Sequence, residues 1–260
     1  MVIKIGPAGL GPINTAKEVL DKYNKIGFKC CEIEFTYSIY IKNKKHAKEI
    51  GKYAKKLGVD LSIHAPYWLN LNSVEKEKIE KTKERILKCC EIGNWIGAKT
   101  VVFHPGYYGK DREGAYDKIK EGIKEMIEEI KKNEWNINLA PECMGKINVF
   151  GSVEEISKLA KETGCSFCID FAHILARNGG KIDMDKINKL FPQKKWHCHF
   201  SGIIYGEKGE KRHKSTKKQE WKNLLDKLPK NKDILIINES PTMIKDCVDG
   251  LEILKKIKGL

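Results

Sequence analysis

The sequence has no apolar stretch near the roughly 20 residues that a helix needs to cross a bilayer. Its N-terminus, MVIKIGPAGLGP, also lacks the charged segment followed by an apolar segment that marks a secretory signal. These two absences argue against a membrane protein and against a secreted one. Isoleucine, leucine, valine and aromatic residues are spread along all 260 residues, which disfavours intrinsic disorder because they can bury a continuous core.

The cysteines do not suit a disulfide framework. They number nine, an odd count, and two pairs, Cys30–Cys31 and Cys89–Cys90, are adjacent in the chain. Disulfide scaffolds are typical of small secreted domains, and adjacent cysteines in a chain of this length fit them poorly. We therefore expect a protein of the reducing cytoplasm, and we expect it to be a monomer.

Arginine and glutamine are scarce, although the chain is strongly basic. Only four of the 49 basic residues are arginine, two residues are glutamine, and the formal net charge is +14. A lysine-rich, glutamine-poor composition is typical of solvated helix faces in thermophilic or compositionally biased proteomes. A basic surplus also suits a polyanionic partner such as nucleic acid. The total charge leaves both interpretations open.

Short apolar runs alternate with longer amphipathic segments along the chain. Parallel strands need a crossover, usually a helix, so this alternation predicts a parallel sheet. Eight such units match a (β/α)8 TIM barrel, and no boundary rich in Pro, Ser or Gly divides residues 1–260 into two domains. An open dinucleotide-binding sheet fits less well, because no GxGxxG follows the first run. The expected strands are residues 2–5, 30–35, 59–64, 100–104, 137–142, 166–170, 195–200 and 234–239; the expected helices are residues 14–26, 44–57, 73–96, 113–131, 152–163, 183–191, 217–228 and 242–257.

Imidazole and carboxylate residues stand at the ends of seven expected strands. Because the C-terminal ends of barrel strands meet at one mouth, these side chains should converge on one pocket. His199 should face the same way as His197, as either an alternative ligand or a neighbour of the ligands. The converging residues are Glu34, His64, His104, Glu142, Asp170, His197 and Glu239, with His173 three positions after Asp170.

This convergence indicates a metal site, with a metal-free polar network as the alternative. Clustered carboxylates repel one another unless a cation neutralises them. The mixture of His, Asp and Glu suits zinc, manganese or iron rather than calcium. Because a catalytic zinc takes about three protein ligands, eight candidates predict two or three ions. Paired ions favour phosphodiester hydrolysis.

Seven motifs occur in order between the third and eighth expected strands: SIHAPYWLNL (62–71), VFHPG (102–106), PECMGK (141–146), CIDFAH (168–173), HCHFSG (197–202), KRHK (211–214) and NESP (238–241). Together they resemble the endonuclease IV family of apurinic/apyrimidinic endonucleases. The resemblance implies a TIM barrel that holds three Zn2+ ions and cuts double-stranded DNA on the 5′ side of abasic sites. A zinc-activated hydroxide would perform the cut and leave a 3′-hydroxyl.

The resemblance also implies roles for single residues. His64 and His104 would bind one zinc ion, and Glu142, the catalytic carboxylate, would bridge it to a second. Through His197 and Ser201, HCHFSG aligns with the family's His-x-x-x-Ser pattern, which leaves His199 outside the ligand set. The remaining implied roles are Asp170, His197 and Glu239 at the second zinc, His173 and His213 at the third, and Tyr67 as a residue that enters the DNA.

The sequence departs from the family pattern at Lys211. An aspartate normally stands there, two residues before the loop histidine, and a lysine ammonium cannot replace a carboxylate ligand. Either Glu210 reaches the third ion, or water fills the position, or the cluster is dinuclear and Lys211 contacts phosphate. The loop 206–218 carries six basic residues against two acidic ones, so we expect Lys211, Arg212 and Lys214 to bind DNA.

The alternative function is a xylose-isomerase-like sugar isomerase or epimerase that uses one or two divalent ions. Mn2+ is the alternative to zinc as the bound metal. Such barrels share the alternating topology and the metal ligands at the strand ends. They need fewer histidines and no basic loop at the mouth. Metal stoichiometry together with DNA affinity would separate the two functions.

Overall fold

The computed structural model describes residues 2–259, and within them eight parallel strands close into a barrel. One sheet has the order β1-β10-β7-β6 and the other β2-β3-β4-β5. The parallel bridges Ala8–Glu32 and Glu142–Cys168 join the two sheets at their two seams. The predicted TIM barrel is therefore confirmed. Its strands are β1 (Ile3–Pro7), β2 (Cys30–Glu34), β3 (Asp60–His64), β4 (Thr100–Phe103), β5 (Asn138–Pro141), β6 (Cys168–Asp170), β7 (Lys195–Phe200) and β10 (Asp233–Asn238).

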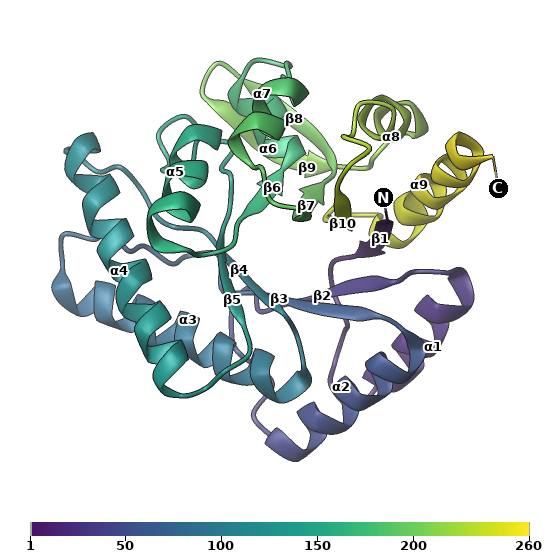
Figure 1. Cartoon of the computed structure of the whole chain (residues 1–260), viewed down its shortest axis with the longest axis horizontal. Coiled ribbons are helices and arrows are strands. Elements are labelled where there is room, and N and C mark those ends of the chain that lie inside the picture. The colour runs from purple at the N-terminus through teal and green to yellow at the C-terminus, as the bar shows by residue number, and fades with distance from the viewer. Residues whose placement is uncertain (1, 260) are drawn as a thin grey trace.

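Helices surround the barrel on its outside (Figure 1). Gly27, Gly58 and Gly97 end the first three helices in the left-handed conformation, which lets the chain turn at once into the next strand. No helix within residues 2–259 is both long and apolar enough to span a membrane. The helices are α1 (Ala16–Ile26), α2 (Lys44–Leu57), α3 (Lys76–Ile96), α4 (Arg112–Lys132), α5 (Val153–Thr163), α6 (Phe171–Arg177), α7 (Met184–Leu190), α8 (Lys218–Leu225) and α9 (Met243–Lys258).

The barrel interior is layered. Alternate residues of each strand point inward, so residues two positions apart on one strand occupy successive layers. Val102, Ala140 and Cys168 form a small apolar cluster, each two positions before a polar residue at a strand end. The mouth therefore has an apolar floor on this side of the barrel. All nine cysteines are buried, and none forms a disulfide within the described chain.

Two parts of the structure differ from the expected elements. The segment expected as the loop 206–218 contains β9 (Gly209–Lys214), which pairs antiparallel with β8 (Gly202–Gly206). The loop prediction is wrong because the many charged residues of this strand look like a solvated loop when read without its pairing partner. The helix α6 was not predicted. It begins directly after β6, where the Asp170 carboxylate caps it by accepting a hydrogen bond from the backbone N–H of His173.

Candidate metal centre

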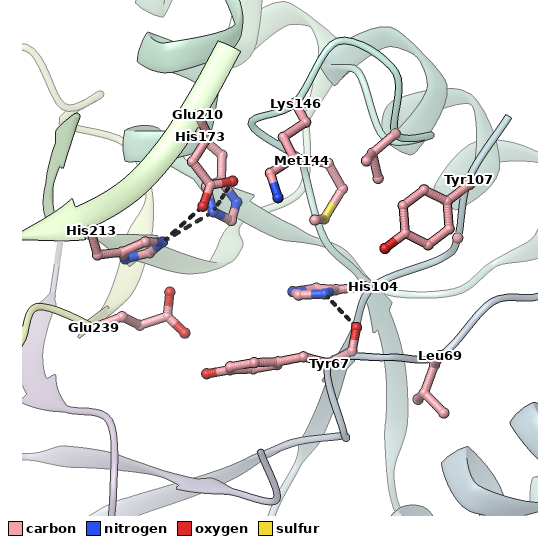
Figure 2. A pocket seen from close by; sticks show the side chains of 12 residues that line it. Tyr67, Leu69, His104, Tyr107, Met144, Lys146, His173, Glu210, His213 and Glu239 are labelled. Atoms are coloured by element: carbon pink, nitrogen blue, oxygen red, sulfur yellow. Dashed lines mark hydrogen bonds and ion pairs between the residues drawn. The ribbon is translucent and has the colours of Figure 1, made fainter. Parts of the chain in front are cut away.

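A cavity of about 410 Å3 opens at the C-terminal ends of the barrel strands. Tyr67 and His104 line one side of it, and the hairpin residues Glu210 and His213 line the other (Figure 2). Glu239 lies between them, immediately after β10. The strand ends therefore converge as the barrel predicts. Several overlapping groups of possible metal ligands lie in and beneath this cavity, and three of them together include every imidazole and carboxylate that lines it.

The first group consists of His64, His104 and Glu142. The Nε2 atoms of the two histidines lie 3.2 Å and 3.1 Å from Oε2 of Glu142. Four ligands that surround zinc at about 2.0–2.1 Å in a tetrahedron lie roughly 3.3 Å from one another, so this spacing fits one ion. Nδ1 of His64 lies 2.6 Å from the carbonyl of Ala65, and Nδ1 of His104 lies 3.1 Å from that of Tyr67. These contacts place hydrogen on Nδ1 and leave Nε2 free to bind a metal.

The second group consists of Glu142, Asp170, His199 and Glu239. Nδ1 of His199 lies 3.1 Å from Oε1 of Glu142 and 3.4 Å from Oε1 of Glu239. Glu142 thus directs one oxygen to the first group and the other oxygen to the second. A carboxylate in this position can bridge two ions.

The structure places His199 in the second group, where the sequence resemblance put His197. Residues of neighbouring parallel strands that pair in register lie at the same level of the barrel, and Asp170 pairs with His199 whereas Cys168 pairs with His197. His197 therefore lies one layer below the mouth. There its Nε2 lies 3.1 Å from the carboxylate of Glu32.

The third group consists of His173, Glu210 and His213. The two histidine Nε2 atoms lie 3.3 Å apart, and Nε2 of His173 lies 3.4 Å from the Glu210 carboxylate. The sequence left open whether Glu210 could reach this position. A β-bulge brings Glu210 within reach. Tyr205 pairs with Glu210 and Ile204 pairs with Arg212, so Lys211 lies between two paired residues and has no partner on β8. The bulge lets Glu210 and His213, three positions apart, approach His173 together.

The charges of this centre are strongly coupled. Burial acts to raise the pKa of the Glu142 carboxyl, but His199, His104 and His173 hold it well below its usual range. His199 likewise lowers the pKa of Glu239 to about 2 against the effect of burial. Burial, together with Glu142 and Glu239, raises the pKa of Asp170 to about 6. The protein thus balances carboxylates against imidazoles, and a metal that binds here must displace protons from the imidazoles.

The residues present fit zinc. Oδ2 of Asp170 is buried and accepts no hydrogen bond from any described residue. Nδ1 of His173 lies 3.3 Å from this oxygen but without hydrogen-bond geometry, and a buried carboxylate oxygen that lacks a hydrogen bond is costly unless a ligand satisfies it. Three imidazole-containing groups with carboxylates and few neutral oxygens also match the donors that zinc prefers over calcium or magnesium.

The residues expected to contact DNA lie at the rim. The Tyr67 ring stacks on His104 with centroids 5.2 Å apart, and its hydroxyl donates a hydrogen bond to Glu34. Lys211 and Arg212 are exposed on β9. Lys214 lies 3.3 Å from Glu220 of α8 and is partly neutralised.

Sequence reasoning missed Lys146, which lines the cavity, and Glu32, which lies below it. Lys146 is the last residue of the PECMGK motif, but periodicity does not show that its side chain lines the mouth, because it follows β5 in an irregular loop. Glu32 could have been found, since strand alternation places it on the same face as Glu34.

Comparison with known proteins agrees with the fold. Residues 20–257 match the sequence profile of the xylose isomerase-like TIM barrel family. The chain belongs to this family. An uncharacterized protein of Methanocaldococcus jannaschii is 35% identical over 266 residues, which cover 95% of each chain.

Two further members of the comparison carry endonuclease names. Probable endonuclease 4 of Acholeplasma laidlawii is 32% identical over 155 residues, so the match covers 55% of this xylose isomerase-like chain and 52% of that protein. The structure of endonuclease IV from Thermus thermophilus superposes with a TM-score of 0.73 at 17% identity, covering 99% of this chain and 100% of that one. The family and these relatives indicate an enzyme of this superfamily.

Proposed function

We propose that this protein is a zinc-dependent endonuclease that hydrolyses double-stranded DNA on the 5′ side of abasic sites and leaves a 3′-hydroxyl. The observation that carries the proposal is the placement of Glu142 between two ligand groups, with a third group beside them. One ion would need only one of these groups. The endonuclease names of the relatives support the same reaction class.

Nine residues would hold the zinc ions, in the three groups described above. Bound zinc lowers the pKa of water and withdraws charge from phosphate oxygens, which is the chemistry that phosphodiester hydrolysis needs. Glu142 would hold two ions at a fixed separation, because each of its oxygens faces a different group. The backbone carbonyls of Ala65 and Tyr67 would keep His64 and His104 oriented towards the same ion.

The cavity supports a substrate that lacks a base. An abasic nucleotide has no stacking partner and is cheap to extrude from the duplex. The cavity of about 410 Å3 is large enough for its sugar and phosphate. Lys146 at the wall and the exposed Lys211 and Arg212 on β9 would contact the flanking phosphates.

The alternative is a sugar isomerase or epimerase. Glu142, Asp170, His199 and Glu239 form one group that could hold a single divalent ion, with Mn2+ as one choice. That function leaves the His64–His104 pair and the His173–Glu210–His213 group unused. The endonuclease accounts for all three groups and is therefore preferred.

Incision of a duplex with one abasic site tests the proposal. Zinc-loaded protein should cut the abasic strand once and leave an end that a DNA polymerase extends, whereas an undamaged duplex of the same sequence should stay intact. Elemental analysis should find two or three zinc ions per chain. One bound ion, with no salt-sensitive DNA binding and no incision, would instead favour the isomerase.

A further inference from the structure

A buried carboxylate lies one layer below the proposed metal centre. Glu32 points into the barrel from β2, and its side chain is fully buried. Its Oε2 lies at hydrogen-bond distance, 3.1 Å, from Nε2 of His197, and its Oε1 lies 2.8 Å from Nε2 of His199 in an ion-pair contact whose angles are not those of a hydrogen bond. Because β1 and β10 separate β2 from β7 in the strand order, these contacts cross the barrel interior.

The His199 ring therefore connects two layers of carboxylates. Its Nε2 faces Glu32 below, and its Nδ1 faces Glu142 and Glu239 above. A histidine that binds a metal through one nitrogen usually donates the hydrogen of the other nitrogen to a carboxylate or carbonyl, which fixes the orientation of the ring. Glu32 is the carboxylate that lies 2.8 Å from this second nitrogen, where it can hold the ring by charge and accept the hydrogen after a small rotation.

His197 holds Glu32 in turn. Each oxygen of the Glu32 carboxylate faces a different imidazole, and both imidazoles come from the same strand, two positions apart. A buried carboxylate is costly unless it is paired, so a simple packing role would favour an apolar residue at this position.

We propose that Glu32 is a positioning residue that directs Nδ1 of His199 towards Glu142, Asp170 and Glu239, and that His197 keeps Glu32 in place. This inference rests on the proposed metal centre. It adds Glu32 and His197, which would orient a ligand without binding an ion themselves. It also gives His197 a role: it supports a ligand from one layer below.

The test compares Glu32→Gln with Ser62→Ala. Ser62 is a suitable control because it pairs in register with Glu32, is also buried, and does not touch the histidines through any described hydrogen bond. Zinc affinity is measured for each variant by chelator competition, and bound zinc by elemental analysis. Glu32→Gln should weaken one zinc site about 10- to 100-fold, and Glu32→Asp should recover part of the loss. Ser62→Ala should match the wild type.

Crystal structures of the metal-free wild type and of Glu32→Gln separate this inference from the proposed function. If the wild type binds no zinc, the proposed metal centre is wrong. The orientation of the His199 ring can still be compared between the two structures, and it shows whether Glu32 positions the ring. A ring that rotates or flips in Glu32→Gln supports the positioning role. A ring that keeps its wild-type orientation, or unchanged zinc affinity in the variant, overturns it.

One further outcome would also overturn the inference. Cys168, His197 and His199 form a group whose donor atoms lie within 4.8 Å of one another. If Glu32→Gln and Cys168→Ala each lost one whole zinc equivalent, an ion would lie in this lower layer. Glu32 would then belong to a metal site rather than orient a ligand of the site above.

Discussion

The strand-borne ligand groups and the hairpin-borne group are built in different ways. His64, Glu142, Asp170 and His199 are almost fully buried, His104 and Glu239 keep 20% and 10% of their side-chain surface, and the strands of a closed barrel carry all six. In the third group, Glu210 and His213 keep 15% and 23% of their side-chain surface and depend on one bulged hairpin. The eight-stranded barrel therefore supports two of the groups, whereas two ligands of the third depend on a two-stranded hairpin with one bulge.

The largest expected effect comes from the residue shared by the two strand-borne groups. Glu142→Gln removes the charge that faces both groups, so incision of an abasic duplex should fall by about 1,000-fold or more. Bound zinc should fall as well. Glu128→Gln, an exposed substitution on α4, is the matched control and should leave both measurements unchanged. Less than a tenfold loss in Glu142→Gln would show that the two groups do not act through this carboxylate.

Graded removal of zinc should separate the two kinds of site. The hairpin-borne site should lose zinc first as chelator is added, because two of its three ligands, Glu210 and His213, depend on a two-stranded bulged hairpin rather than on the closed barrel. The strand-borne sites should lose zinc later and together. Bound zinc stabilises the fold, at about 2.7 kcal/mol when free zinc is 100 times the dissociation constant, so the late step should also lower the Tm. Elemental analysis and thermal unfolding at each chelator concentration check this order. Simultaneous loss of all zinc would contradict the comparison.

We expect substitutions of two adjacent hairpin residues to have different effects on zinc affinity. Glu210→Gln should weaken the hairpin-borne zinc site about 10- to 100-fold, because the carboxylate faces both histidines of that group. Lys211→Asp should not strengthen the site, although it restores the carboxylate of the family pattern. Lys211 is the extra residue of the bulge, and its side chain runs towards Gly206. Zinc affinity measured for both variants decides the point: a gain in Lys211→Asp would mean that the bulge is not kept.

Regular periodicity made the strand-borne groups largely predictable. Apolar runs of four to six residues, seven of the eight with an imidazole or carboxylate at or near the C-terminal end, predict the barrel and its mouth. The choice between His197 and His199 could not be made in this way, because both face the interior. It depends on the register between β6 and β7, a property of two strands rather than one.

The hairpin-borne group was harder to predict for a related reason. In a regular strand, residues three apart lie on opposite faces, so Glu210 and His213 would not meet. Only the bulge brings them together, and a bulge leaves no periodic signal in the sequence. The family pattern placed the ligand position at Lys211, because it counts two residues back from the loop histidine. It does not take into account that the bulge adds one residue there.

The smallest expected effect concerns the charges of the same hairpin. If Lys211 and Arg212 each contact one phosphate, replacing either with alanine should reduce the slope of log affinity against log salt by about 1. Lys214→Ala should change the slope less, because Glu220 already lies 3.3 Å from its ammonium. Affinity for an abasic duplex at several salt concentrations measures all three. Zinc content should stay constant in these variants, so that an altered slope reports phosphate contacts alone. Slopes equal to that of the wild type in all three variants would mean that DNA binds the barrel mouth without the hairpin, and that the basic surplus of β9 belongs to the lysine-rich surface of the protein.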